Sequence, residues 1–172
     1  PEEKKDTLTW AMNNWVEGMM KATDGYVTAW DVVNEAISGG GNDEGFYTLQ
    51  SASNVSPEDA KNNFYWQDYL GNVDYVRIVV AAARKYYAEN GGTAPLKLFV
   101  NDYNLESDWD DNKKVKSLVH WIEKWEADGV TKIDGIGTQM HVSCYANAAT
   151  QKSKEDHVVK MFEILAESGK LV

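Results

Sequence analysis

An amide and a carboxyl stand side by side where the apolar segment 27–33 ends, as Asn34 and Glu35. The segment is rich in β-branched residues and lies between Gly25 and the run Gly39–Gly41, which is typical of a parallel strand covered on both faces. A glutamate after such a strand, beside a fixed amide donor, can act as a general acid or base on a polar substrate. For an isolated Asn-Glu pair, a strand-end salt bridge is the commoner role.

Two further expected strands also end in polar side chains. The segment 96–100 runs into Asn101–Asn104, and the segment 133–138 runs into Gln139–His141. Barrel and open α/β folds place their chemistry at the carboxyl ends of parallel strands. We therefore expect these side chains to gather at one rim of a repeated strand-helix unit, which is the pattern of a barrel enzyme.

Four apolar stripes with i, i+3, i+4, i+7 spacing predict the helices between these strands. They run from Leu8 to Met20, from Val76 to Tyr87, from Val115 to Trp125 and from Val158 to Ala166. Glycines suited to a left-handed cap follow the last three, at positions 91–92, 129 and 169. Ser153 and Asp156 resemble a capping box for the last helix. The alternation of helices and strands predicts an α/β fold with a parallel sheet.

The connection 38–74 interrupts this alternation, and its aromatic cluster predicts a short ordered helix. The cluster consists of Phe64, Tyr65, Trp66 and Tyr69. The chain has seven tryptophans and nine tyrosines, whose flat faces suit sugar rings, but most of them lie on helical stripes and are expected in the core. The acidic run Glu106, Asp108, Asp110 and Asp111 lacks the pattern of a calcium loop, so we expect a solvated helix start there.

Composition narrows the choice of partners. The net charge of −10 argues against nucleic acid and against an anionic membrane surface, because both would be repelled. No segment is long and apolar enough to span a bilayer, and no signal peptide is visible at Pro1. The single cysteine, Cys144, excludes an internal disulfide. We expect no cofactor and no metal.

Three motifs together resemble the endo-xylanases of glycoside hydrolase family 10. They are WDVVNEA at 30–36, FVNDYN at 99–104 and DGIGTQMHVS at 134–143. The resemblance covers essentially the whole chain, and it implies part of a TIM (β/α)8 barrel in which the three strands are the fourth, fifth and sixth. A complete barrel typically needs about 250 residues. Residues 1–172 are therefore expected to be a central segment of a family 10 catalytic domain.

The resemblance also implies roles for individual residues. Glu35 matches the general acid/base of a retaining double displacement, and Asn34 matches the amide that binds the sugar 2-hydroxyl. Gln139 and His141 match residues that hydrogen-bond near the nucleophile. The other substrate-binding residues implied are Tyr103 and Asn104, on the leaving-group side. The nucleophile glutamate is expected from outside this chain.

The function expected from this resemblance is endo-hydrolysis of β-1,4-xylosidic linkages. The expected partners are xylan or xylo-oligosaccharide and companion segments that complete the barrel, with no nucleic acid and no membrane. By analogy with the family, the expected location is secreted, periplasmic or cell-surface. The alternatives are a non-catalytic fragment that at most binds xylo-oligosaccharide, and a related retaining β-glycanase of the same barrel superfamily.

Overall fold

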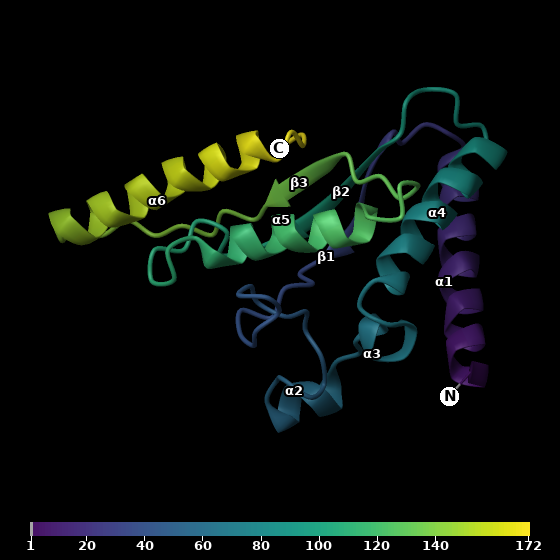
Figure 1. The fold of residues 1–172 in the computed structure, drawn as a ribbon. Coiled ribbons are helices and arrows are strands. Elements are labelled where there is room, and N and C mark those ends of the chain that lie inside the picture. The colour runs from purple at the N-terminus through teal and green to yellow at the C-terminus, as the bar shows by residue number, and fades with distance from the viewer. Residues whose placement is uncertain (1) are drawn as a thin grey trace.

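The computed structural model describes residues 2–172, which form a three-stranded parallel sheet and the helices that pack against it (Figure 1). In chain order the elements are α1 Glu2–Thr23, β1 Ala29–Asn34, α2 Pro57–Asn62, α3 Trp66–Leu70, α4 Asp74–Glu89, β2 Lys97–Asp102, α5 Lys113–Glu126, β3 Gly135–Thr138 and α6 Ala148–Glu167. This order confirms the predicted alternation of helices and strands. It also confirms a short helix, α3, at the aromatic cluster.

The two faces of the sheet differ in how they are covered. β2 lies between β1 and β3, and both pairings are parallel. Leu98, Val100 and Ile136 on one face are fully buried in a core shared with the helices. On the other face, Asp31 is exposed and its neighbour Phe99 is half-buried. We call this second face the open face.

An irregularity in β1 determines which side chains reach the open face. Asp31 pairs with Phe99, but the next partner of β2, Val100, pairs with Val33, so one residue of β1 is bulged out of the pairing. Such a bulge reverses the alternation of side chains beyond it. Asn34 therefore lies beside Asn101 on the open face. Strict alternation from Asp31 would instead direct Asn34 under the helices.

The outer edge of β3 is partly paired by the last residues of the chain. The N–H of Ile136 donates to the carbonyl of Leu171 at 2.8 Å, and the N–H of Leu171 donates to the carbonyl of Asp134 at 3.0 Å. The resulting bridge between Gly135 and Leu171 is parallel. The chain after α6 thus runs beside β3 in the direction that a further barrel strand would take.

The predicted capping box of the last helix is wrong. α6 begins at Ala148, and the side chain of Asn147 accepts from the N–H of Thr150 at 2.9 Å. Asparagine is among the best N-cap residues, so the helix starts one and a half turns before Ser153. The hydroxyl of Ser153 donates instead to Asp108 at 2.9 Å.

The predicted stripe of α6 is only partly buried. Met161 and Leu165 are inaccessible, whereas Val159 and Phe162 are 58% and 42% exposed. Local spacing identified the helix, but the position of α6 against α5 selected a different set of residues for the core.

The expectation for the aromatic residues is also partly wrong, since three tryptophans are about two-thirds exposed. They are Trp10 at 67%, Trp15 at 70% and Trp109 at 67%.

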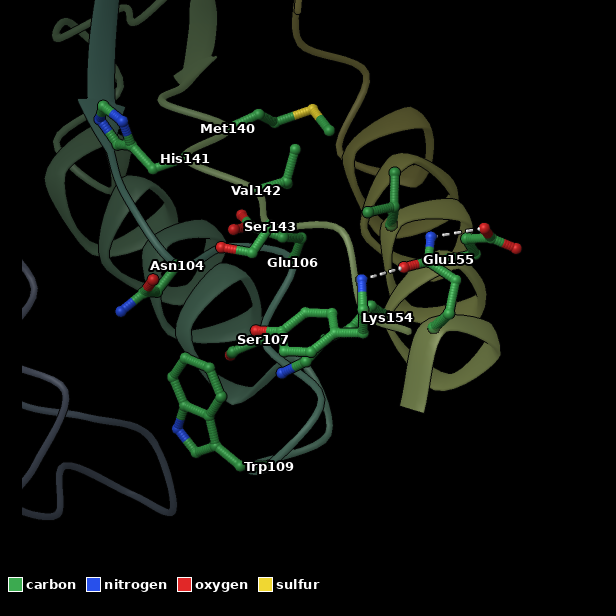
Figure 2. Close-up of a pocket in the computed structure, with 13 residues that line it drawn as sticks. Asn104, Glu106, Ser107, Trp109, Met140, His141, Val142, Ser143, Lys154 and Glu155 are labelled. Carbon is green, nitrogen blue, oxygen red and sulfur yellow. Dashed lines mark hydrogen bonds between the residues drawn. The ribbon is translucent and has the colours of Figure 1, made fainter. Parts of the chain in front are cut away.

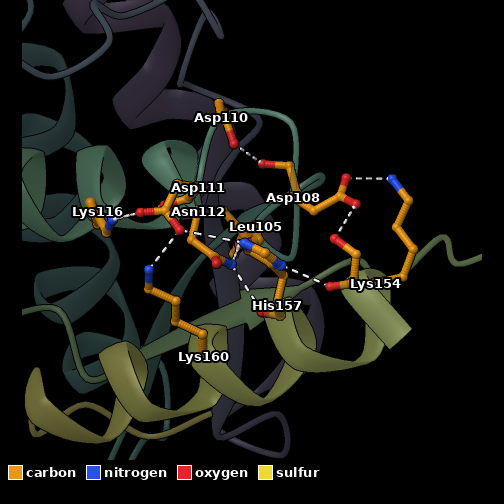
Figure 3. Close-up of polar contacts among 11 residues, drawn as sticks. Leu105, Asp108, Asp110, Asp111, Asn112, Lys116, Lys154, His157 and Lys160 are labelled. Atoms are coloured by element: carbon orange, nitrogen blue, oxygen red, sulfur yellow. Dashed lines mark hydrogen bonds and ion pairs between the residues drawn. The ribbon is translucent and has the colours of Figure 1, made fainter. Parts of the chain in front are cut away.

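Two residues of the acidic run after β2, Asp108 and Asp111, form an ion-pair network with α5 and α6, where we predicted a solvated helix start (Figure 3). Asp108 accepts from Lys154 of α6 at 2.5 Å. Asp111 accepts from Lys160 of α6 at 2.6 Å and from Lys116 of α5 at 3.3 Å. These hydrogen bonds, with Lys160 the strongest contributor, lower the pKa of Asp111 to about 2. The run therefore fastens the start of α5 to α6.

Three predicted glycine caps are confirmed by positive φ angles. Gly91, Gly129 and Gly169 have φ of 85°, 71° and 68° after α4, α5 and α6.

None of the helices described for residues 2–172 has the length and hydropathy that a bilayer crossing requires.

Candidate active site

The backbone of Glu35 is fixed in an unusual conformation directly after β1. Its φ is 57°, in the left-handed region that residues other than glycine rarely adopt. Its N–H donates to the carbonyl of Asn101 at 2.8 Å, and its carbonyl accepts from Nε2 of Gln50 at 2.6 Å. Strained backbone of this kind persists where the surroundings hold it, often at functional sites. The Cα–Cβ bond of the half-buried Glu35 therefore leaves the backbone in a fixed direction.

Asn34 is joined to the end of β3 by a side-chain hydrogen bond. Its Oδ1 accepts from Nε2 of Gln139 at 2.8 Å, and the N–H of Gln139 donates to the carbonyl of Asp102 at 3.0 Å. This bond crosses β2 and brings two predicted site residues, Asn34 and Gln139, together at one rim of the sheet. With Oδ1 engaged as the acceptor, the Asn34 amide presents its donor hydrogens to a ligand.

A buried ion pair supports Tyr103 at the same rim. Nζ of Lys114 lies 2.8 Å from Oδ1 of Asp102 and 3.4 Å from the centre of the Tyr103 ring. Burial raises the pKa of Asp102, and Lys114 opposes that shift. The pKa of Tyr103 is raised by burial first and then by the negative charges of Asp102 and Glu35. Tyr103 is therefore within electrostatic reach of Glu35.

Glu35 and Asn34 line a pocket of about 470 Å³. Its other wall comes from α3 and the connection before it, including Gln50, Phe64, Tyr65, Trp66 and Gln67. Gln67 donates to the carbonyl of Gln50, whose own side chain holds the carbonyl of Glu35. Our sequence reasoning missed these two glutamines, because an isolated glutamine in a long connection carries no local signal of its target.

Two predicted site residues lie in a second pocket instead (Figure 2). Asn104 and His141 line a cavity of about 310 Å³ between the β2 and β3 loops and the start of α6. Neither is among the residues that line the pocket of Glu35. His141 is exposed, so it is not a buried, hydrogen-bonded histidine of the core. Its role beside the nucleophile stays a prediction.

One cluster among residues 2–172 has the composition of a metal site. Ligand atoms of Asp43, Glu44 and His120 lie within 4.8 Å of one another. Lys124 already donates to Asp43 at 2.5 Å, and Nε2 of His120 lies 3.0 Å from the same carboxylate oxygen. Hydrogen bonding from Lys124 lowers the pKa of Asp43. We interpret the cluster as an ion-pair group that fastens the long connection to α5.

Comparison with known proteins identifies the family. The model of glycosyl hydrolase family 10 matches residues 2–170. The chain belongs to glycosyl hydrolase family 10. It is 32% identical to endo-1,4-beta-xylanase C of Paenibacillus barcinonensis over 148 residues, which are 82% of this chain and 11% of that protein.

Solved family 10 structures have the same fold. The endo-1,4-beta-xylanase of Caldicellulosiruptor owensensis is 27% identical, with a TM-score of 0.63 over 96% of this chain and 40% of that one. A mutant structure in complex with xylotriose is 25% identical, with a TM-score of 0.63 and the same coverage. The fold is therefore part of a TIM barrel, as predicted, and the chain spans well under two thirds of these relatives.

The number of carboxylates in the pocket of Glu35 bears on its chemistry, because glycoside hydrolases typically use a pair of Asp or Glu residues. Among residues 2–172, Glu35 is the one Asp or Glu that lines its pocket. A retaining glycosidase places a second carboxylate roughly 5–5.5 Å from the first. Among residues 2–172 this pocket therefore contains a single carboxylate, on a fixed backbone and beside the oriented amide of Asn34.

Proposed function

We propose that this chain supplies the acid/base half of the active site of a retaining endo-β-1,4-xylanase. Glu35 protonates the leaving glycosidic oxygen and then deprotonates the attacking water. The observation that carries this proposal is the fixed backbone of Glu35, whose N–H and carbonyl are both hydrogen-bonded while the residue lines a pocket. The xylanase names of the relatives and the xylotriose in a similar structure support the choice of substrate.

Asn34 provides the contact to the sugar 2-hydroxyl in this proposal. Gln139 holds the side-chain carbonyl oxygen of Asn34, which leaves the amide N–H groups of Asn34 to donate to the sugar. A donor fixed in advance loses little entropy when it binds, and its bond can strengthen as charge develops at the sugar ring.

The nucleophile comes from outside residues 2–172 in this proposal, on companion segments that also cover the open face. That face carries Ala29, Asp31, Phe99 and Asn101 without a helix over them, beside a shallow hollow. The parallel bridge at Leu171 supports a further strand on the β3 side. We further propose a secreted, periplasmic or cell-surface location, because xylan is an extracellular polymer.

Replacing Glu35 tests the function. In the protein that carries this chain, Glu35→Ala should nearly abolish xylan hydrolysis while sparing the first step on aryl xylosides, whose good leaving groups need no protonation. Steady-state rates on both substrates measure this, with Glu44→Gln as an exposed control. Equal loss on both substrates would indicate a structural role for Glu35 and would contradict the proposal.

A further inference from the structure

Asp102, the last residue of β2, is completely buried, and its carboxyl group has three hydrogen-bond donors around it. Oδ2 accepts from the N–H of Ile37 at 3.1 Å, and Oδ1 accepts from the N–H of Tyr103 at 2.9 Å. Nζ of the buried Lys114 lies 2.8 Å from Oδ1. Because every partner of this carboxyl group among residues 2–172 is a donor, a proton on it would find no acceptor. The ionised form of Asp102 therefore fits its surroundings.

The hydrogen bond to Ile37 extends the pairing of β1 with β2 beyond the end of β1. The N–H of Glu35 donates to the carbonyl of Asn101 at 2.8 Å, and two residues later the N–H of Ile37 donates to the side chain of Asp102. The left-handed backbone of Glu35, with φ of 57°, lies between these two bonds. Strained backbone persists only where its surroundings hold it, and Asp102 supplies the bond that follows the strained residue along the chain.

A carboxylate suits this position better than any neutral side chain. Its two oxygens accept from the N–H groups of two different segments, the one after β1 and the one after β2. An asparagine has a single acceptor oxygen, so its NH₂ group would face one of the two N–H donors. A buried ion pair contributes little to stability, because the cost of taking both charges out of water offsets their attraction. The geometry that the Asp102–Lys114 pair fixes therefore explains it better than a gain in stability.

The charge of Asp102 also reaches the pocket of Glu35. Burial, and then the charge of Asp102, raises the pKa of Tyr75, which lines that pocket. The pKa of Tyr103 is raised by burial and by the charges of Asp102 and Glu35. Both carboxylates therefore act on one ring. Nζ of Lys114, 3.4 Å from the centre of that ring, balances the charge of Asp102.

We propose that Asp102, kept ionised by Lys114, is a positioning residue that fixes the direction of Glu35 for protonation of the leaving oxygen. The inference rests on the proposed function, because it assigns the residues through which Glu35 is placed. Asp102 is completely buried, so it acts through its hydrogen bond to Ile37 and not by contact with the sugar. Loss of that bond releases the backbone after Glu35, and a displacement of about 1 Å can lower a rate by about a hundredfold.

Two substrates that differ in their leaving groups show whether Asp102 acts through Glu35. In the protein that carries this chain, Asp102→Asn should lower the first-step rate on phenyl xylobioside by about ten- to a hundredfold. The rate on dinitrophenyl xylobioside should fall much less, because that leaving group needs no proton from Glu35. In a Glu35→Ala background, Asp102→Asn should add little further loss on phenyl xylobioside, since the group that it positions is gone.

Asp134→Asn is the matched control, because Asp134 is also a buried carboxylate held by a cation and a backbone N–H. Its Oδ2 accepts from Arg84 and from the N–H of Leu98, each at 2.9 Å. Asp134 precedes β3, so it lies at the end of the sheet away from Glu35. Asp134→Asn should lower the free energy of unfolding and leave the ratio of the two rates unchanged.

A double variant separates positioning from folding. Asp102→Asn leaves the charge of Lys114 buried and unpaired, whereas Asp102→Asn with Lys114→Met buries no charge. This double variant should fold and show the same selective loss on phenyl xylobioside. An unchanged rate on that substrate, an equal loss on both substrates, or an undiminished loss in the Glu35→Ala background would overturn the inference. Failure of the proposed function shows instead in Glu35→Ala alone, as an equal loss on both substrates with Asp102 intact.

Discussion

Asn34 and Glu35, at the rim of the sheet, are placed by two departures from regular strand geometry. The bulge in β1 turns Asn34 to the open face beside Asn101. Directly after it, the left-handed backbone of Glu35 is held by hydrogen bonds to Asn101 and Gln50. Both features cost free energy, and both are fixed by contacts with other segments. The positions of Asn34 and Glu35 therefore depend on contacts with Asn101 and Gln50 as well as on the two residues themselves.

Asn34→Ala should reduce catalysis more than binding. If the amide contact to the sugar 2-hydroxyl strengthens in the transition state, kcat should fall by about tenfold or more while KM rises little. Steady-state kinetics on xylan and on a 2-deoxy substrate measure this, and the loss should be smaller on the deoxy substrate. Asn14→Ala, an exposed change on α1, is the control. A raised KM with kcat intact would remove Asn34 from the transition-state role.

Between elements, two turns meet so closely that a glycine is required. Gly25 follows α1 with φ of 72°, and a Cβ there would lie 2.3 Å from the carbonyl oxygen of Gly91 after α4. Gly39 has the same φ of 72° but meets nothing within 4 Å. Comparing substitutions at Gly25 and Gly39 therefore separates the cost of a left-handed backbone from the cost of the clash between the two turns.

Gly25→Ala should therefore destabilise the fold more than Gly39→Ala. Left-handed strain alone should cost about 1 kcal/mol in both variants. The backbone clash at Gly25 should add about 1–3 kcal/mol by pushing the two turns apart. Chemical denaturation of both variants gives the difference. Equal free energies of unfolding would show that the turns yield at no cost.

The attachment of α6 to α5 should depend on acidity through Asp111. Its folded-state pKa of about 2 lies below the ordinary value of 3.8. The ionised carboxylate therefore contributes stability that is fully present above about pH 4 and is lost as the pH falls toward 2. Asp111 is exposed, so the contribution is small and sensitive to salt.

Asp111→Asn tests this dependence. The free energy of unfolding should be lower than in the wild type at pH 6, and the two proteins should converge below about pH 2. Denaturation curves between pH 2 and 6 measure the difference. Asp156→Asn is the control, because Asp156 pairs with Lys152 inside α6 itself at 2.8 Å. A gap that stays constant with pH would contradict the assignment.

At the scale of the whole molecule, residues 1–172 on their own should be inactive and should not form a stable monomer. Among residues 2–172 no helix covers the open face of the sheet, and exposed apolar side chains such as Trp15 and Phe162 lie on α1 and α6. The edge of β1 has no strand partner other than β2 among the described residues. Monomeric proteins rarely leave such surfaces uncovered.

Expression of residues 1–172 alone provides the test. Size-exclusion chromatography should show association or aggregation, heating should give a broad transition, and xylan should not be hydrolysed. A single monomeric species with a sharp thermal transition would show that these surfaces are tolerated. Xylan hydrolysis by this species would overturn the proposal that the nucleophile comes from outside the chain.

The amino-acid sequence by itself determined the elements and the residues at their ends. Periodic apolar stripes predicted α1, α4, α5 and α6, and short β-branched runs predicted the three strands. The motifs around Glu35, Tyr103 and Gln139 identified the family that the comparisons confirm. These features are readable because helix spacing, strand composition and terminal glycines are local properties of the chain.

Only the tertiary structure decided how these parts meet. The bulge that turns Asn34 outward depends on β2, more than sixty residues later, and the buried partner of Asp102 is Lys114 on α5. The exposed Trp109 and the ion pairs of α6 likewise depend on which helices pack together. Such contacts leave no periodic trace in the sequence, because they are set by the free energy of packing segments that are distant in the chain.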